Sequence, residues 1–406
     1  MNILFYTEWN ITPNSGGIGR VTAILTDYFR RHYGWKVYSI YSARYQHKCE
    51  ETDTDGSVQL RLHDRFGLRK RVKANYPSAA NFVVDNKIDV VVIQSSMEVS
   101  KHLRQALRKQ NYEVKIITCL HFTPGKDIFL TRLSDIKKAD KLNRESLKIV
   151  VKALLSPVYN SLMIGLTKRG YRWAYRYSDR ILVLSEKYKD SFSRFSGIAD
   201  KGKLSVMPNP LSFEGNFKEE DRGNKKHTAL VVGRVSEYEK RISVILTIWG
   251  EYEKRSPESD WQLVIVGEGV SLNDYKKQAE QLGLKRCSFK GQQNPIDYYR
   301  QSELFLMTSA FEGFPMTLVE AQQCGCVPIV MNSFLALPEI VTDGRNGIVV
   351  DSGDREGFLN AILLLTDNSG QLKKMAESGM EDCQRFSQKT VCERWKRFLE
   401  EVCRKE

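Results

Sequence analysis

The sequence has no long hydrophobic run: none of its apolar segments approaches the roughly 20 residues that a membrane-spanning helix needs. It also has no signal-peptide pattern, because Met1–Thr7 leads directly into an apolar, strand-like segment without a basic start or a small-residue cleavage site. The first absence argues against an integral membrane protein, and the second argues against secretion. We therefore expect a cytoplasmic chain.

The eight cysteines are scattered, without a CxxC pair or a neighbouring cluster of histidines. Cys324 and Cys326 are close in the sequence, but two thiols do not complete a four-ligand zinc site. Thiols also stay reduced in the cytoplasm. We therefore expect structural or incidental thiols and no metal site.

Acidic residues are in deficit, because 49 Asp and Glu face 62 Lys and Arg and leave a net charge of +13. The isoelectric point is near 9.2. Such an excess attracts nucleic acids, phosphorylated ligands or anionic membranes. Because no zinc finger, helix-turn-helix or RNP-like pattern occurs, we expect no nucleic-acid partner.

What the sequence does contain is a regular alternation of short β-branched runs with helical patterns. Such alternation is typical of βαβ units and mainly parallel sheets. Two sets in one chain predict an α/β protein with two doubly wound domains. The expected strands are Ile3–Thr7, Lys36–Tyr41, Val58–Leu62, Asp89–Gln94, Lys115–Leu120, Arg180–Leu184, Lys203–Met207, Thr228–Val232, Trp261–Val266, Arg286–Phe289, Leu304–Met307, Val327–Met331 and Gly347–Val350.

The boundary between the two domains is marked by Pro208-Asn209-Pro210 and by the polar stretch that follows. One segment, about 125–177, is longer than an ordinary connection and is expected to carry its own helices. The expected parts are an N-terminal domain over 1–207 with that helical insertion, a linker over 208–227, a C-terminal domain over 228–383 and a terminal helix over 384–406.

The strongest chemical signal runs from Glu312 through Gly313, Phe314 and Pro315 to Glu320. This segment follows an expected strand and opens a helix, whose first amides and positive dipole end can bind a diphosphate. A carboxylate on each side of that anion can accept hydrogen bonds from sugar and ribose hydroxyls. An ordinary helix start with surface glutamates remains the alternative.

Three further clusters lie at the ends of expected strands, where parallel sheets bind ligands. Gly233-Arg234 and Lys240 could neutralise a departing diphosphate without a metal, although a solvated basic loop would look the same. Gly16-Gly17 would let the backbone approach a ligand closely. His121 ends a strand, where a structural role is as plausible as contact with a ligand.

In this order, the clusters resemble the family-four group of retaining glycosyltransferases. The later stretches Pro338-Glu339-Ile340 and Asp343–Gly347 also look like that family. The resemblance spans nearly the whole chain. It implies the GT-B fold, in which two Rossmann-like domains face a cleft and the terminal helix crosses back to the N-terminal domain. One departure is Arg241, which stands where a glycine often follows the lysine.

By resemblance, Arg234 and Lys240 would bind the donor diphosphate and stabilise the leaving group. Glu312 would hold hydroxyls of the donor sugar, and Glu320 would hold the ribose. The resemblance assigns the remaining contacts to the backbone around Phe314, Pro315, Met316 and Thr317, to Gly16 and Gly17 closing from the first domain, and to His121 at the donor sugar.

The resemblance therefore implies transfer of a hexose or N-acetylhexosamine from a nucleotide-diphosphate sugar, with UDP expected as the nucleotide. No cofactor and no metal are expected, because Asp53-Thr54-Asp55, which matches the DxD of metal-dependent glycosyltransferases of another fold, lies in a polar loop. The expected acceptor is a growing surface glycan such as lipopolysaccharide or capsule, on a lipid-linked carrier. The alternatives are a small soluble acceptor, a sugar-nucleotide epimerase, or a catalytically silent binding subunit.

The expected insertion is strongly basic between Lys137 and Arg176, with Asp140 and Glu145 as its acidic residues. Apolar residues are interleaved with the charges, a pattern of basic amphipathic helices that lie on anionic membranes. We therefore expect peripheral binding to the inner face of the cell membrane, although the apolar positions could instead pack on the first domain. The basic residues are Lys137, Lys138, Lys141, Arg144, Lys148, Lys152, Lys168, Arg169, Arg172 and Arg176.

Overall fold

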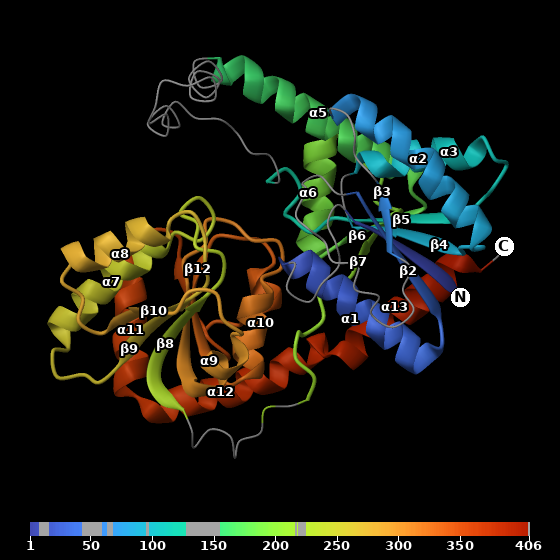
Figure 1. Ribbon diagram of the computed structural model, residues 1–406. Coiled ribbons are helices and arrows are strands. Elements are labelled where there is room, and N and C mark those ends of the chain that lie inside the picture. Colours follow the sequence, from blue (N-terminus) through green and yellow to red (C-terminus); the bar gives the residue numbers. More distant parts are fainter. Residues whose placement is uncertain are drawn as a thin grey trace. The chain divides into compact units, whose positions relative to one another are not determined.

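The computed structural model describes residues 1–7, 16–42, 59–62, 68–94, 97–126, 155–215, 217 and 225–404. Contacts group the chain into two compact units. Unit 1 comprises Met1–Val206 with Lys396–Glu406, and unit 2 comprises Met207–Trp395. Each unit contains its own sheet, flanked by helices (Figure 1).

The sheet of unit 1 has seven strands in the order β3-β2-β1-β4-β5-β6-β7. All of its described pairs are parallel. Because the order reverses between β1 and β4, loops diverge there and leave room for a ligand at the carboxyl ends of these strands. The strands are β1 (Asn2–Thr7), β2 (Lys36–Ser42), β3 (Gln59–Leu62), β4 (Val90–Ile93), β5 (Lys115–Cys119), β6 (Arg180–Val183) and β7 (Leu204–Val206).

Helices cover both faces of this sheet, because strands such as β4 are fully buried and need apolar cover on each side. Figure 1 shows α2, α3 and α5 on one face and α1 with the end of α13 on the other. The helices are α1 (Gly16–Tyr33), α2 (Leu68–Asp85), α3 (Glu98–Arg108), α5 (Ser156–Tyr177), α6 (Glu186–Ser196) and α13 (Gln388–Cys403).

The sheet of unit 2 has six strands in the order β10-β9-β8-β11-β12-β13, again with parallel pairs. Its order reverses between β8 and β11, which are hydrogen-bonded neighbours. The strands are β8 (Lys226–Val232), β9 (Gln262–Val266), β10 (Cys287–Phe289), β11 (Ser302–Met307), β12 (Val327–Asn332) and β13 (Ile348–Asp351).

A large core packs on one face of this second sheet, with Trp249, Phe358 and Ile362 completely buried in it. In Figure 1, α7, α8 and α11 lie on one face and α9 and α10 on the other. The helices are α7 (Ile242–Arg255), α8 (Leu272–Gln281), α9 (Ile296–Gln301), α10 (Met316–Gln323), α11 (Arg355–Asp367) and α12 (Ser369–Asp382), with short 3-10 helices at η3 (Leu337–Glu339) and η4 (Cys383–Phe386).

The α/β fold class predicted from the sequence is confirmed, and all thirteen expected strands are present with ends that differ by at most two residues. Of the expected helical insertion, α5 is described and 127–154 lies outside the described residues. The first residues of the expected linker are not an exposed connection. Asn209, Pro210 and Leu211 are buried and belong to unit 2. In the described part, no helix is both long and apolar enough to span a membrane.

Candidate functional site

The candidate site of unit 2 lies at the carboxyl ends of β8 and β11, on either side of the point where the strand order reverses. The loops after these strands are tied together. The amide of Ala310 donates to the carbonyl of Glu239 at 2.7 Å. The Thr308 hydroxyl donates to the carbonyls of Lys240 and Arg241 at 3.2 and 3.0 Å. These bonds bring the loop with Lys240 against the loop that leads to α10.

The two loops also meet through their side chains. Lys240 Nζ lies 2.5 Å from Oε1 of Glu312, and the side chains are 19% and 13% exposed. Arg234 is different, because its side chain is 70% exposed and contacts Glu239 at 3.4 Å. The structure therefore brings Lys240 and Glu312 together, and leaves the Arg234 guanidinium largely in solvent at the same edge of the sheet.

The backbone directly after β8 and β9 needs residues without side chains. Gly233 has φ +150°, and a Cβ on Gly267 would lie 1.9 Å from the Gly233 carbonyl oxygen. Arg241 has φ +47°, a left-handed conformation that favours glycine. The strain occurs at the position where the family that the sequence resembles often has glycine. The Nε atom of Arg241 is also buried without a hydrogen-bond partner.

Helix α10 begins directly after the β11 loop. Pro315 is its N-cap and gives no capping side chain, and its first turn has no acidic residue. The amides of Met316 and Thr317 have no acceptor within the helix, because the first turn lies before the hydrogen-bond ladder starts. The Thr317 hydroxyl is also buried without a partner. This helix start can therefore accept an anion.

Phe314 holds the entry to α10 in place. Its ring is 5% exposed and packs edge-on against Phe386, with 5.1 Å between the centroids. Its carbonyl accepts from the Asn209 side chain at 3.4 Å. The backbone of Phe314 is thus fixed by residues that the sequence assigned to a linker and to a terminal segment.

Glu320 lies on the buried side of α10 and is 1% exposed. One carboxylate oxygen accepts from the Ser212 hydroxyl, and the other accepts from the Tyr299 hydroxyl at 3.0 Å. The sequence did not identify Ser212 or Tyr299. No local pattern marks them, since they lie 108 and 21 residues from Glu320.

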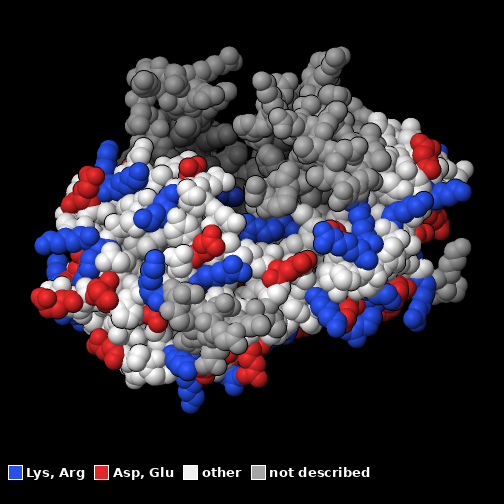
Figure 2. All heavy atoms as spheres, turned by 60° about the horizontal axis from the view of Figure 1, so that its bottom comes forward, with Lys and Arg blue, Asp and Glu red and all other residues white. Residues whose placement is uncertain are grey.

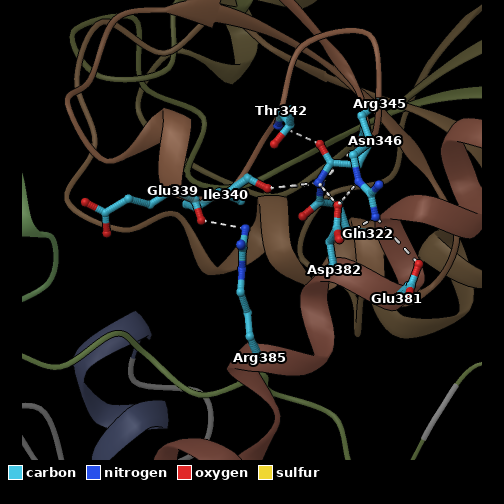
Figure 3. A network of polar contacts seen from close by, with 9 residues as sticks. All are labelled: Gln322, Glu339, Ile340, Thr342, Arg345, Asn346, Glu381, Asp382 and Arg385. Atoms are coloured by element: carbon cyan, nitrogen blue, oxygen red, sulfur yellow. Dashed lines mark hydrogen bonds and ion pairs between the residues drawn. The ribbon is translucent and has the colours of Figure 1, made fainter.

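The far end of α10 is held by a polar network that Figure 3 shows from close by. Asn346 is fully buried; its amide donates to Asp382 at 2.9 Å and its oxygen accepts from the Thr342 amide at 2.7 Å. Gln322 of α10 donates to the carbonyl of Asn346 at 3.3 Å. The network ties the Asp343–Gly347 stretch to α10 and to the end of α12.

In unit 1, the predicted residue His121 follows β5 and lies next to the end of β4. Its Nε2 atom is 2.5 Å from Oε1 of Gln94, the residue after β4. Burial lowers the pKa of His121 to about 4, so the imidazole is neutral at physiological pH. Gln94 itself is 3% exposed, and its Nε2 atom is buried without a partner.

The predicted glycine pair opens α1, the helix that follows β1 in the chain. Gly16 and Gly17 are exposed and open α1, and Gly16 has φ +84°. Asn14 and Ser15, which precede them, lie outside the described residues. The structure thus places Gly16, Gly17 and His121 in unit 1 and the remaining predicted site residues in unit 2.

Within the described residues, no cluster of three or more His, Cys, Asp and Glu side chains could hold a metal ion. The Asp53-Thr54-Asp55 stretch lies outside these residues. On the face shown in Figure 2, Lys and Arg side chains are intermixed with Asp and Glu, so this face does not carry the excess positive charge as one patch.

Two family models match the chain. Residues 15–214 match the model described as glycosyltransferase family 4, and residues 212–382 match the model described as glycosyl transferases group 1. The two models meet where unit 1 gives way to unit 2.

Known proteins agree with these matches. The chain is 23% identical over 332 residues to the amylovoran biosynthesis glycosyltransferase of Erwinia amylovora, covering 78% of this chain and 87% of that one. It is 27% identical over 222 residues to the UDP-Gal:α-D-GlcNAc-diphosphoundecaprenol α-1,3-galactosyltransferase of Escherichia coli, covering 50% and 56%. Among solved structures, a lipopolysaccharide outer core galactosyltransferase superposes with a TM-score of 0.69 at 19% identity, covering 98% of both chains.

Three observations lead to one assignment: the two parallel sheets, the candidate site where β8 and β11 meet, and the family matches. The chain belongs to family 4 of the glycosyltransferases and is a nucleotide-sugar-dependent glycosyltransferase with the GT-B fold.

Proposed function

We propose that the chain is a retaining, metal-independent hexosyl- or N-acetylhexosaminyltransferase that uses a UDP-sugar. The observation that supports this most is the meeting of Lys240, Glu312 and the open start of α10 at one switch point. A lysine and free helix amides suit a diphosphate, and a carboxylate suits sugar hydroxyls. UDP is proposed as the nucleotide because the Escherichia coli relative is named for UDP-galactose.

In the proposed reaction, the bond between the anomeric carbon and the β-phosphate oxygen breaks while the acceptor hydroxyl bonds to the same face of the sugar. The hydroxyl proton passes to the departing phosphate oxygen, so the reaction needs no enzymic nucleophile. Arg234, Lys240 and the first amides of α10 stabilise the charge that builds on the diphosphate. Glu312 accepts hydrogen bonds from sugar hydroxyls, and Lys240 then interacts with both Glu312 and the phosphate.

Glu320 is proposed to accept hydrogen bonds from the ribose. Ser212 and Tyr299 donate to this carboxylate and fix its orientation. The ribose hydroxyls would bind to the carboxylate in that orientation. The contacts of Gly16, Gly17 and His121 with the donor sugar stay predictions.

The proposed acceptor is a growing surface glycan on a lipid carrier at the inner face of the cell membrane. The names of the relatives support this, since one acts on a diphosphoundecaprenol-linked sugar and another serves amylovoran biosynthesis. Transfer to a small soluble acceptor is the second candidate. A silent binding subunit is disfavoured because Arg234, Lys240, Glu312 and Glu320 are all present.

A donor panel tests this proposal. Purified chain is incubated with nucleotide sugars, with membrane extracts or simple sugars as acceptors, and with EDTA. We expect release of UDP and a product that keeps the donor's anomeric configuration. An inverted product, or transfer that returns only when manganese or magnesium is added, would contradict the proposal.

A further inference from the structure

Helix α5 presents an apolar face that no described part of the chain covers. Leu155, which precedes the helix, and Val158, Leu162 and Leu166 within it are 57%, 72%, 59% and 39% exposed. Their spacing of three, four and four residues places them in one row along the helix. We name these four residues the α5 stripe. Apolar side chains in one exposed row are uncommon on a soluble surface and mark an interaction site.

The stripe is not part of the core of unit 1, because α5 is anchored there mainly by its second half. Tyr171 and Ala174 are buried, and the Tyr171 ring packs against those of Phe192 and Phe195 on α6 with centroids 5.4 and 5.0 Å apart. In the first half, Ser156 alone is buried. Figure 1 shows the first turns of α5 reaching beyond α6 and α2.

Along the helix, the same row continues as Arg169, Trp173 and Arg176. The Trp173 ring contacts two cations, with Lys101 Nζ 3.7 Å and the Arg169 guanidinium carbon 4.4 Å from its centroid. Tryptophan beside arginine and lysine is characteristic of segments that lie at a membrane surface, where the indole sits at the level of the headgroups.

The charge of α5 has one sign. The helix is 22 residues long and contains Lys168, Arg169, Arg172 and Arg176 but no Asp or Glu. Among the described residues, no carboxylate forms an ion pair with any of these four cations. This differs from the face in Figure 2, where both signs are intermixed. Cations that no described carboxylate neutralises are complementary to an anionic surface.

The position of the stripe in unit 1 fits such a role. A helix between two parallel strands runs from their carboxyl edge back to their amino edge, so the first half of α5 lies toward the carboxyl edge of the sheet. His121 lies at this edge, and the next residue, Phe122, is 51% exposed. The stripe is therefore on the side of unit 1 where its candidate site residues are.

We propose that α5 is an interfacial helix that docks unit 1 on an anionic lipid bilayer, with the α5 stripe entering the acyl boundary and Arg169 and Arg176 on the headgroups. The helix is about 33 Å long at 1.5 Å per residue, and it is tilted so that its first half meets the bilayer and its second half stays on unit 1. An anionic protein partner is disfavoured, because the row has apolar residues at one end and cations at the other without intermixed polar contacts. This inference deepens the proposed function, since a lipid-linked acceptor would be reached from that surface.

Vesicle co-sedimentation of the full chain tests the proposal. The probes are vesicles of phosphatidylcholine alone and of phosphatidylcholine with phosphatidylglycerol, across a salt series. We expect binding to the anionic vesicles, weakening as salt screens the charges, and little binding to the zwitterionic ones. Wild-type protein that ignores anionic vesicles at low salt overturns the proposal.

Two variants separate the apolar from the ionic contribution. Val158→Gln with Leu162→Gln and Leu166→Gln should lower partitioning at least about tenfold for each side chain. Arg169→Gln with Arg176→Gln should lower it about 30-fold, or about fivefold for each charge. All of these side chains are on the exposed face of α5, so thermal unfolding should match the wild type.

Matched controls lie on exposed helices of unit 2. Leu364→Gln on α11 replaces a leucine that is 46% exposed, and Lys276→Gln with Lys277→Gln neutralises two exposed cations on α8. Both should bind vesicles like the wild type. If the stripe variant binds vesicles as well as these controls, or if it only converts a dimer into a monomer in sedimentation velocity, the proposal is wrong.

Donor turnover in solution separates this inference from the proposed function. UDP release without vesicles should be equal in the wild type, the stripe variant and the controls. Loss of vesicle binding with turnover retained is the expected behaviour of the stripe variant. Wild-type turnover without vesicle binding would refute the docking alone, whereas vesicle binding without turnover of any nucleotide sugar would refute the proposed function alone.

Discussion

Lys240 Nζ and Glu312 Oε1 lie 2.5 Å apart although 72 residues separate them in the sequence. Both side chains are mostly buried, so removing either one leaves a poorly solvated charge, at a cost of about 2 kcal/mol. We expect Lys240→Met and Glu312→Gln to lower the free energy of unfolding singly, and the double variant to lose less than the sum.

The rate should behave differently from the stability. Because Lys240 acts on charge that develops in the transition state, its loss should lower kcat by about two to three orders of magnitude. The double variant should regain stability but no turnover, as measured by denaturant unfolding and UDP release. If turnover returns together with stability, the ion pair is structural and the donor is bound elsewhere.

Glu312 and Glu320 should differ in their kinetic effects. Glu312→Ala removes an anchor beside the reacting sugar, so kcat should fall strongly. Glu320→Ala removes contacts made equally in the ground state and the transition state, so KM for the donor should carry more of the loss. Steady-state kinetics measure the two constants, and unchanged values in both variants would contradict the assigned roles.

The partners of Glu320 give a finer test of its role. Ser212→Ala and Tyr299→Phe each remove one donor from the buried carboxylate. We expect donor KM to rise several-fold with kcat nearly unchanged, because the carboxylate loses its fixed orientation. Ser243→Ala serves as the control, since that hydroxyl donates to the exposed Glu237 instead. Equal kinetics in Ser212→Ala and Ser243→Ala would contradict a positioning role.

Arg241 is a strained residue whose replacement should stabilise the protein. Its φ of +47° costs about 1 kcal/mol for a residue with a side chain, and glycine avoids this cost. Arg241→Gly should therefore raise the free energy of unfolding by about 1 kcal/mol in a denaturant titration. Arg241→Ala keeps the strain and is the control; equal stability of the two variants would contradict the explanation.

His121 predicts a pH dependence of stability with a definite sign. Its pKa is about 4 in the folded chain and 6.5 in the unfolded chain, so the unfolded state binds more protons between these values. The free energy of unfolding should fall as the pH falls from 6.5 to 4, by at most about 3 kcal/mol from this group. His121→Gln should reduce that slope, and an unchanged slope would contradict the burial of the neutral imidazole.

Much of the fold could be predicted because strand and helix periodicity is local. Each expected strand, such as Lys115–Leu120, is a short apolar run between turn residues, and burial on both faces maintains such runs in a parallel sheet. The order of the strands is not local. Strand β8 pairs with β11, which is not its neighbour in the sequence, and this pairing is known only from the structure.

The same limit applies to the site. Lys240 and Glu312 were both predicted from strand ends, but their ion pair depends on the β8/β11 adjacency. Ser212 was assigned to a linker because Pro208-Asn209-Pro210 interrupts the strand pattern, whereas the chain there packs against α10. Gln94 is the last residue of one expected strand, and His121 directly follows the next expected strand. A polar residue at the end of an apolar strand is the signal that could have identified Gln94 as a partner of His121.

The most direct test of the account is UDP release from a UDP-sugar by wild-type chain and by Lys240→Met, both in EDTA. Lys276→Gln, on the exposed face of α8, is the matched control. We expect full activity in the wild type and the control and a loss of about two to three orders of magnitude in Lys240→Met. Equal release by Lys240→Met, or wild-type activity that EDTA abolishes, would contradict it.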